Sequence, residues 1–217
     1  MKLIRITQGT PAWLTWRQGG IGGSDAAAIL GLSPFATREN LLREKISRTE
    51  REMNFAMRRG VALEPEARAL YEERHRCLSP PACVEHDQHS WMRVSLDGLA
   101  SQRNLREQWG VEIKCGNWET HSATLATGEV PEHYRPQCQW QLLVSDLPFL
   151  HYVSFTKHER FGEADRLATV VVDHDAELQA RLLEECEKFW GEVLEGRKAL
   201  AAWLVRPLNP RVEAEFA

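Results

Sequence analysis

The stretch that decides the fold is "GVEIKC", residues 110–115. Side chains alternate faces along a strand, so Glu112 and Lys114 share one face while Val111 and Ile113 share the other. A Glu-x-Lys pair is most often a weak ion pair on a solvated sheet face, worth about 0–1 kcal/mol. If both faces of the strand are covered, however, a buried glutamate and lysine need a partner or a function.

The rest of the chain places this strand in the middle of a sheet. Apolar and β-branched runs predict strands at 83–85, 91–95, 111–114, 150–157 and 167–172. Helical patterns are found at about 13–19, 24–30, 37–48, 54–75, 118–127, 131–145 and 174–203. This order predicts an α/β (α+β) fold with a mixed central sheet flanked by helices.

Capping and breaking residues predict several element ends. In "GGSDAAAILG" we expect Ser24 to be the N-cap of an alanine-rich helix and Gly31 to end it. Gly60 and Pro65 are expected to interrupt the helix at 54–75. Asp173 is expected to cap the last amphipathic helix, which reaches about residue 203.

Length and composition predict one globular domain, residues 1–217, with its motifs between about 13 and 172. The chain is 43% hydrophobic and 27% charged, and it lacks the long apolar run of a membrane span or signal peptide. We therefore expect a cytoplasmic protein without a membrane partner. The net charge is −4, and it is unevenly distributed: 13 acidic and only 8 basic residues lie from Glu159 onward. A basic surface formed by residues 1–158 is therefore compatible with the net charge of the chain.

The stretch "CVEHDQH" has a residue that can bind a metal at every third position: Cys83, His86 and His89. A zinc site would need a fourth ligand, which the neighbouring sequence lacks. We therefore interpret the stretch as part of a hairpin between strands. The five cysteines include no C-x-x-C pair, which favours reduced thiols over a disulfide framework.

A second carboxylate is expected to lie beside Glu112. Asp97 ends the strand in "VSLDGL", with fourteen residues between it and Glu112, and Gly98 permits a sharp turn there. If the two strands pair, both carboxylates and Lys114 converge. Two neighbouring carboxylates repel unless a cation joins them, and hard oxygen donors suit magnesium or manganese.

This set resembles the active site of the PD-(D/E)XK nucleases, with "SLD" and "EIK" in the motif positions. Further stretches, in order and over roughly residues 13–145, resemble the phage lambda exonuclease family, also called YqaJ-type viral recombinases. They are "WLTWRQGGIGGSDAAAILG", "RGVALEPEA", "SLDG" with "EIKC", and "YRPQCQWQLLVS". The chain departs from the family at Leu96, where proline is more frequent; this side chain is not a ligand.

The resemblance implies a role for each matching residue of the catalytic cluster. Asp97 and Glu112 would be metal ligands, joined by the backbone carbonyl of Ile113. Lys114 would position or activate the attacking water and stabilise developing negative charge. Glu64 would help to hold the metal, although an ordinary glutamate on a helix surface is the alternative.

The same resemblance implies a set of DNA and phosphate contacts. Arg17 and Ser24 would bind a terminal phosphate, and Ser95, Gln137 and Gln139 belong to the same set. For Ser24 the alternative role is the N-cap alone, and both roles are compatible. For the two glutamines the alternative is a polar helix face; Gln137 is the better match to the family.

The family implies a magnesium-dependent 5′ to 3′ exonuclease, with Mn²⁺ as a substitute metal. It would degrade one strand of linear double-stranded DNA to mononucleotides, prefer 5′-phosphorylated ends and leave 3′ single strands for phage-type recombination. A homotrimer and a single-strand annealing protein are the implied partners. Two alternatives remain: a nuclease of other polarity or endonuclease action, which would not need Arg17 and Ser24, and a non-catalytic DNA-binding module.

Overall fold

The computed structural model of the chain describes residues 1–49, 52–102 and 107–205. Its strands form two sheets. An antiparallel sheet contains, in order, β1 (Lys2–Ile4), β2 (Ala82–Glu85) and β3 (Arg93–Leu96). A mixed sheet contains, in order, β4 (Gly98–Ser101), β5 (Gln108–Lys114), β6 (Leu150–Phe155) and β7 (Leu167–Val172). Strand β5 pairs antiparallel with β4 and parallel with β6, so it is central in the sheet, as the sequence predicts.

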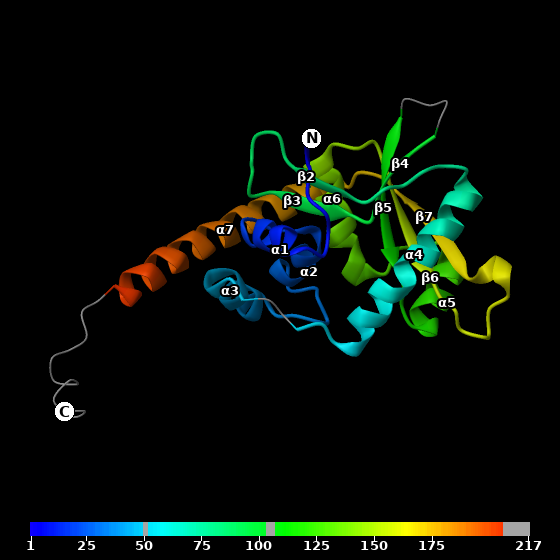
Figure 1. The fold of residues 1–217 in the computed structure, drawn as a ribbon, viewed down its shortest axis with the longest axis horizontal. Coiled ribbons are helices and arrows are strands. Elements are labelled where there is room, and N and C mark those ends of the chain that lie inside the picture. Colours follow the sequence, from blue (N-terminus) through cyan, green and yellow to red (C-terminus); the bar gives the residue numbers. More distant parts are fainter. Residues whose placement is uncertain (50–51, 103–106, 206–217) are drawn as a thin grey trace.

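Helices surround both sheets (Figure 1). They are α1 (Pro11–Gln18), α2 (Gly23–Ile29), α3 (Arg38–Ser47), α4 (Phe55–His75), α5 (Trp118–Thr127), α6 (Arg135–Ser145) and α7 (Ala176–Leu204), with 3₁₀ turns at Glu132–Tyr134 and Glu163–Asp165. The predicted α/β class with a mixed sheet is confirmed. Helix α7 extends away from the rest of the molecule at its C-terminal end (Figure 1). Within the described ranges no helix is both long enough and apolar enough to cross a membrane.

Two hydrophobic cores lie on opposite faces of β5. Helix α6 contacts both sheets and packs with α2 and α7 around buried Trp140 and Leu142. On the other face, α4 packs against β5 around buried Tyr71, Val111 and Ile113. Because side chains alternate, the face of β5 that carries Glu112 is the one covered by α6. Both faces are therefore covered, which explains why the charged pair has partners inside the protein.

Two predicted helix caps are each wrong by two residues. Helix α2 starts after Gly22, whose N–H donates to the Asp25 carboxylate at 2.9 Å, so Ser24 lies inside the helix and is not its N-cap. An acidic side chain at the third helical position can bond back to the cap residue, and here it replaces the expected serine. Helix α7 is capped by Asp175 rather than Asp173, since the Asp175 carboxylate accepts from the Leu178 N–H at 3.0 Å.

Helix α4 continues through Gly60 and Pro65, contrary to the prediction. Proline removes one main-chain donor, which frees the carbonyl four residues earlier, at Val61. Both Val61 and Pro65 are exposed, so water can bond that carbonyl and the helix persists. Strands β1, of three residues, and β4, of four residues, are absent from the prediction. The predicted hairpin is present as the antiparallel pair of β2 and β3.

Candidate active site

Asp97 is the one residue between the last strand of the first sheet and the first strand of the second. Because β4 pairs with β5 in the register Gly98–Val111, Asp97 is brought next to Glu112. The Ile113 N–H donates to Asp97 Oδ2 at 2.7 Å, which fixes the carboxylate at the end of β5. The predicted convergence of the two acidic residues is thus present in the fold.

Gly98 has a different role from the predicted turn, because it is the first residue of β4. A Cβ atom at this position would lie 2.8 Å from Ser79 Cβ and 3.1 Å from Val111 Cβ. The glycine is required by the close approach of neighbouring chain segments. It therefore permits Asp97 to lie close to β5.

Glu112 is almost completely buried, with 2% of its surface exposed, and its carboxylate is bonded on both oxygens. Oε1 accepts from Lys114 Nζ and from Gln137 Nε2, each at 2.5 Å, and Oε2 accepts from Gln141 Nε2 at 2.5 Å. The sequence analysis missed Gln141. The sequence does contain an indication of its role: Gln141 follows Gln137 by four residues, which places both amides on one helix face.

The charge of the cluster is not balanced by its own side chains. Burial, followed by the nearby charge of Glu112, raises the pKa of Asp97 well above its ordinary value. The positive charge of Lys114 lowers this pKa, but by less than burial and Glu112 raise it. Burial would lower the pKa of Lys114, but Glu112 and Asp97 raise it overall. Two carboxylates thus share one ammonium group, and a further cation would stabilise their ionised forms.

Glu64 approaches this cluster from α4, where it is bonded to Arg68. The guanidinium of Arg68 donates to Glu64 Oε1, to the main-chain carbonyl of Asp97, and to the Ser79 carbonyl at 3.0 Å. The charge of Glu64 also contributes to the raised pKa of Asp97. Arg68 was missed by the sequence analysis, although its position four residues after Glu64 indicates a pair on one helix face.

The donor atoms in this cluster fit a hard divalent cation. Asp97 and Glu112 supply carboxylate oxygens, and the Ile113 carbonyl leaves β5 on the same edge as the N–H that bonds Asp97. Pairing with β4 ends at Gly98–Val111, so it does not occupy that carbonyl. Such oxygen donors suit Mg²⁺ or Mn²⁺. In the part of the chain that the structure describes, no three acidic, histidine or cysteine side chains already form a metal cage, and Glu64 would have to leave Arg68 to join one.

Three of the predicted phosphate contacts gather around Trp13 on α1. The Arg17 guanidinium lies 4.7 Å from the centre of the Trp13 ring and donates to Ser24 Oγ at 2.8 Å. The indole N–H of Trp13 donates to Ser95 Oγ, also at 2.8 Å. Ser95 is far from Arg17 and Ser24 in sequence, and the tertiary structure joins the three into one polar cluster.

This polar cluster is held next to the carboxylates. An ideal Cβ on Gly23, the first residue of α2, would lie 3.3 Å from the Cγ atoms of both Gln137 and Gln141. Those glutamines bond Glu112, so only their side chains separate the start of α2 from the carboxylate. A buried ion pair, Lys45 Nζ to Asp25 Oδ2 at 2.7 Å, attaches α2 to α3.

Gln139 does not belong to either cluster. It donates to the Asp173 carbonyl at 2.8 Å and accepts from the Asp175 N–H at 2.9 Å. Two residues correspond to about 200° around a helix, so Gln139 faces away from Gln137. In this structure the Gln139 amide connects α6 to the start of α7, away from the other predicted phosphate contacts.

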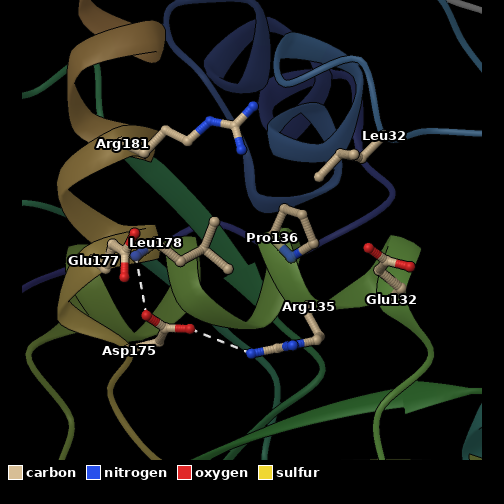
Figure 2. A pocket seen from close by; sticks show the side chains of 8 residues that line it. All are labelled: Leu32, Glu132, Arg135, Pro136, Asp175, Glu177, Leu178 and Arg181. Carbon is tan, nitrogen blue, oxygen red and sulfur yellow. Dashed lines mark hydrogen bonds and ion pairs between the residues drawn. The ribbon is translucent and has the colours of Figure 1, made fainter.

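The pocket in Figure 2 lies on this other side of α6 and has a volume of about 250 Å³. Leu32, Pro136 and Leu178 form its apolar surface, and Arg135 and Arg181 lie on opposite sides of it (Figure 2). Arg135 is paired with Asp175 at 3.2 Å. The pocket is thus separate from the carboxylates, which lie at the face of α6 that carries Gln137.

Comparisons with known proteins agree with this geometry. A model of the YqaJ-like viral recombinase domain matches residues 12–148. The alkaline exonuclease LHK-Exo from Laribacter hongkongensis is 26% identical and superposes with a TM-score of 0.75, over 96% of this chain and 100% of that chain; its complex with dAMP gives the same values. A phage-related exonuclease from Haemophilus somnus 129PT has a similar fold, with a TM-score of 0.56 at 14% identity over 85% of this chain and 96% of that one. A search of curated proteins found no match.

Proposed function

Because the chain belongs to the YqaJ-like viral recombinase family, we propose that it is a magnesium-dependent 5′ to 3′ exonuclease that degrades one strand of linear double-stranded DNA. The observation that carries the proposal is the convergence of Asp97, Glu112 and Lys114 where the two sheets meet. The likeness to an alkaline exonuclease over nearly the whole chain supports a nuclease activity.

Each residue of the cluster has a distinct role in this proposal. Asp97, Glu112 and the Ile113 carbonyl would hold Mg²⁺, which supplies an activated water and charge stabilisation when bound. Lys114 orients the water and stabilises the negative charge that develops on the phosphate. Gln137 and Gln141 hold the Glu112 carboxylate in one orientation, since each amide bonds a different oxygen.

The polar cluster around Trp13 supports the 5′ to 3′ polarity. Arg17 and Ser24 would bind the 5′-terminal phosphate, and Ser95 lies beside them through Trp13. A guanidinium binds a phosphate monoester bidentately, and the monoester carries more charge than an internal diester. Products would be mononucleotides with 5′ phosphates. A homotrimer, a single-strand annealing partner and a cytoplasmic location complete the proposal.

The proposal is tested with linear duplexes labelled separately at their 5′ and 3′ ends. With Mg²⁺ we expect the 5′ label to be released first and a 3′ single strand to accumulate, whereas chelator should stop digestion. Asp97→Asn and Glu112→Gln, which retain shape but remove charge, should each abolish cleavage. First release of the 3′ label would contradict the polarity, nicking of circular duplex would indicate an endonuclease, and binding without cutting would indicate a DNA-binding module.

A further inference from the structure

The ammonium group of Lys114 has a second partner besides Glu112. Its Nζ lies 5.1 Å from the centre of the Tyr134 ring, within the range in which a cation is attracted to an aromatic face. Tyr134 ends the 3₁₀ turn at Glu132–Tyr134 and immediately precedes α6, the helix that carries Gln137 and Gln141. The ring is thus attached to the same element that orients Glu112.

The Tyr134 ring also contacts a buried aromatic ring. It lies 5.9 Å from the ring of Tyr152, centre to centre, with 32° between the planes, and Tyr152 is fully buried on β6. Tyr152 is the strand neighbour of Glu112 in the register of β5 and β6. Contacts therefore connect the buried Tyr152 through Tyr134 to the Lys114 ammonium group.

The contact depends on the ring and not on the phenol hydroxyl. No hydrogen bond to the Tyr134 hydroxyl is present within the described residues, whereas the ring contacts both Lys114 and Tyr152. A phenylalanine at this position would keep both ring contacts. A leucine or methionine would keep apolar volume but lose the attraction for the cation.

We propose that Tyr134 is a positioning residue that holds the Lys114 ammonium group for the reaction, an inference that rests on the proposed nuclease function. The physical reason is that Glu112 cannot do this alone: a carboxylate that also binds a metal attracts a neighbouring ammonium group less strongly. The aromatic face attracts the cation from a different direction and does not compete for the metal. Lys114 then keeps its orientation when the charge of Glu112 is shared.

The first test measures the contact in metal-free protein and needs no activity. Protons above an aromatic ring shift upfield in NMR spectra, so the ε-CH₂ protons of Lys114, assigned by comparison with Lys114→Ala, should be shifted in wild type and in Tyr134→Phe. The shift should disappear in Tyr134→Leu. An unshifted Lys114 signal in the wild type, or one that Tyr134→Leu leaves in place, would overturn the contact even if the protein is an active exonuclease.

The second test is kinetic and uses a double-mutant cycle. Tyr134→Leu should lower kcat about five- to thirtyfold, the range of a desolvated cation–aromatic contact, and leave KM unchanged. Tyr134→Phe should stay within about twofold of wild type. In a Lys114→Ala background, Tyr134→Leu should cause no further loss, because the group that it positions is absent.

The outcomes separate positioning from a general packing role. The proposal would be overturned if Tyr134→Leu lowered kcat equally in the wild-type and Lys114→Ala backgrounds, or if it changed KM alone. It would also be overturned if Tyr134→Phe and Tyr134→Leu lowered kcat equally. Melting temperatures of the metal-free variants check folding, and Tyr134→Met replaces Tyr134→Leu if the latter is unstable. Absence of activity in the wild type would refute the nuclease function, while the NMR measurement would still decide whether the contact exists.

Discussion

At the residue scale, the site depends on a glutamate that is both buried and charged. A buried carboxylate is stable only if its oxygens are bonded, and Glu112 receives one ammonium and two amide groups. Hydrogen bonds to a charged group contribute about 1.5–3 kcal/mol each, more than bonds between neutral groups. Lys114, Gln137 and Gln141 therefore hold Glu112 in place at the proposed catalytic cluster.

Arg17 is the residue that most directly tests end recognition. Its guanidinium bonds Ser24 and stacks on Trp13. A 5′-terminal phosphate would bind the guanidinium N–H groups that do not bond Ser24. We expect Arg17→Ala to slow digestion of 5′-phosphorylated duplex about ten- to a hundredfold, which corresponds to losing about 1.5–3 kcal/mol. Digestion of 5′-hydroxyl duplex should change little. The ratio of the two initial rates is the measurement.

A matched control is Arg181→Ala, which removes an exposed arginine at the pocket of Figure 2. It should leave the ratio of rates at its wild-type value. If Arg17→Ala slows both duplexes equally, Arg17 supports the local structure or general DNA binding, and the terminal phosphate is recognised elsewhere.

At the element scale, the site is made by β4, a strand of four residues. Its pairing with β5 begins at Gly98, directly after Asp97, so the start of the strand determines where that carboxylate lies. The close packing of Gly98 against Ser79 and Val111 leaves no room for a side chain. A short strand thus links the packing of the second sheet to the position of a proposed metal ligand.

Gly98→Ala tests this link. The new methyl group would lie 2.8 Å from Ser79 Cβ and 3.0 Å from the Ser79 carbonyl oxygen, so β4 must shift. We expect the free energy of unfolding to fall by about 1–3 kcal/mol, as measured by urea unfolding of metal-free protein. Activity at a temperature where the variant is folded should fall as well, because Asp97 moves with the strand.

Gly60→Ala is the control on α4, where an added Cβ atom would lie in open space, with nothing from the other described parts of the chain within 4 Å. Alanine favours a helix over glycine, so this variant should be stabilised by up to about 1 kcal/mol. If Gly98→Ala is equally harmless, the close approach at β4 does not control the position of Asp97.

At the scale of the whole molecule, two cores on opposite faces of the second sheet hold the site between them. The core beneath α4 contains a chain of buried polar groups: the Trp109 N–H donates to the Tyr71 hydroxyl oxygen at 2.8 Å, and that hydroxyl lies 2.7 Å from His151 Nδ1. The Tyr71 hydroxyl can accept from Trp109 and donate its own proton to Nδ1 when His151 is neutral. Burial favours this neutral form of His151 by lowering its pKa.

The whole fold should consequently lose stability in acid through His151. Burial, with a contribution from His75, lowers the pKa of His151 to about 4, below the unfolded value of about 6.5. A folded pKa below the unfolded one means that the stabilisation is complete above about pH 6.5 and is lost as the pH falls towards 4. The loss should reach about 3 kcal/mol at most.

The measurement compares the free energy of unfolding of wild type and His151→Gln between pH 7 and pH 4. Glutamine does not titrate, so the stability advantage of the wild type should shrink as the pH falls. Parallel pH curves for the two proteins would show that protonation of His151 does not control acid stability.

The sequence by itself determined the features that follow from local period and order. Alternation along β5 put Glu112 and Lys114 on one face, and the apolar patterns located the seven helices and the strands β2, β3, β5, β6 and β7. The family resemblance, carried by four stretches in order, was confirmed by the match over residues 12–148. These predictions held because each depends on neighbouring residues or on a long run of sequence.

Only the tertiary structure decided which polar groups meet. Helical spacing shows that Gln137 and Gln141 share a face and that Gln139 lies on another, but the face that meets Glu112 depends on how α6 packs between the sheets and α7. For the same reason Arg68, from α4, could not be placed beside Asp97 by sequence. A hydrogen bond requires two groups within about 3 Å, and for residues far apart in the chain only the packing of whole elements sets that distance.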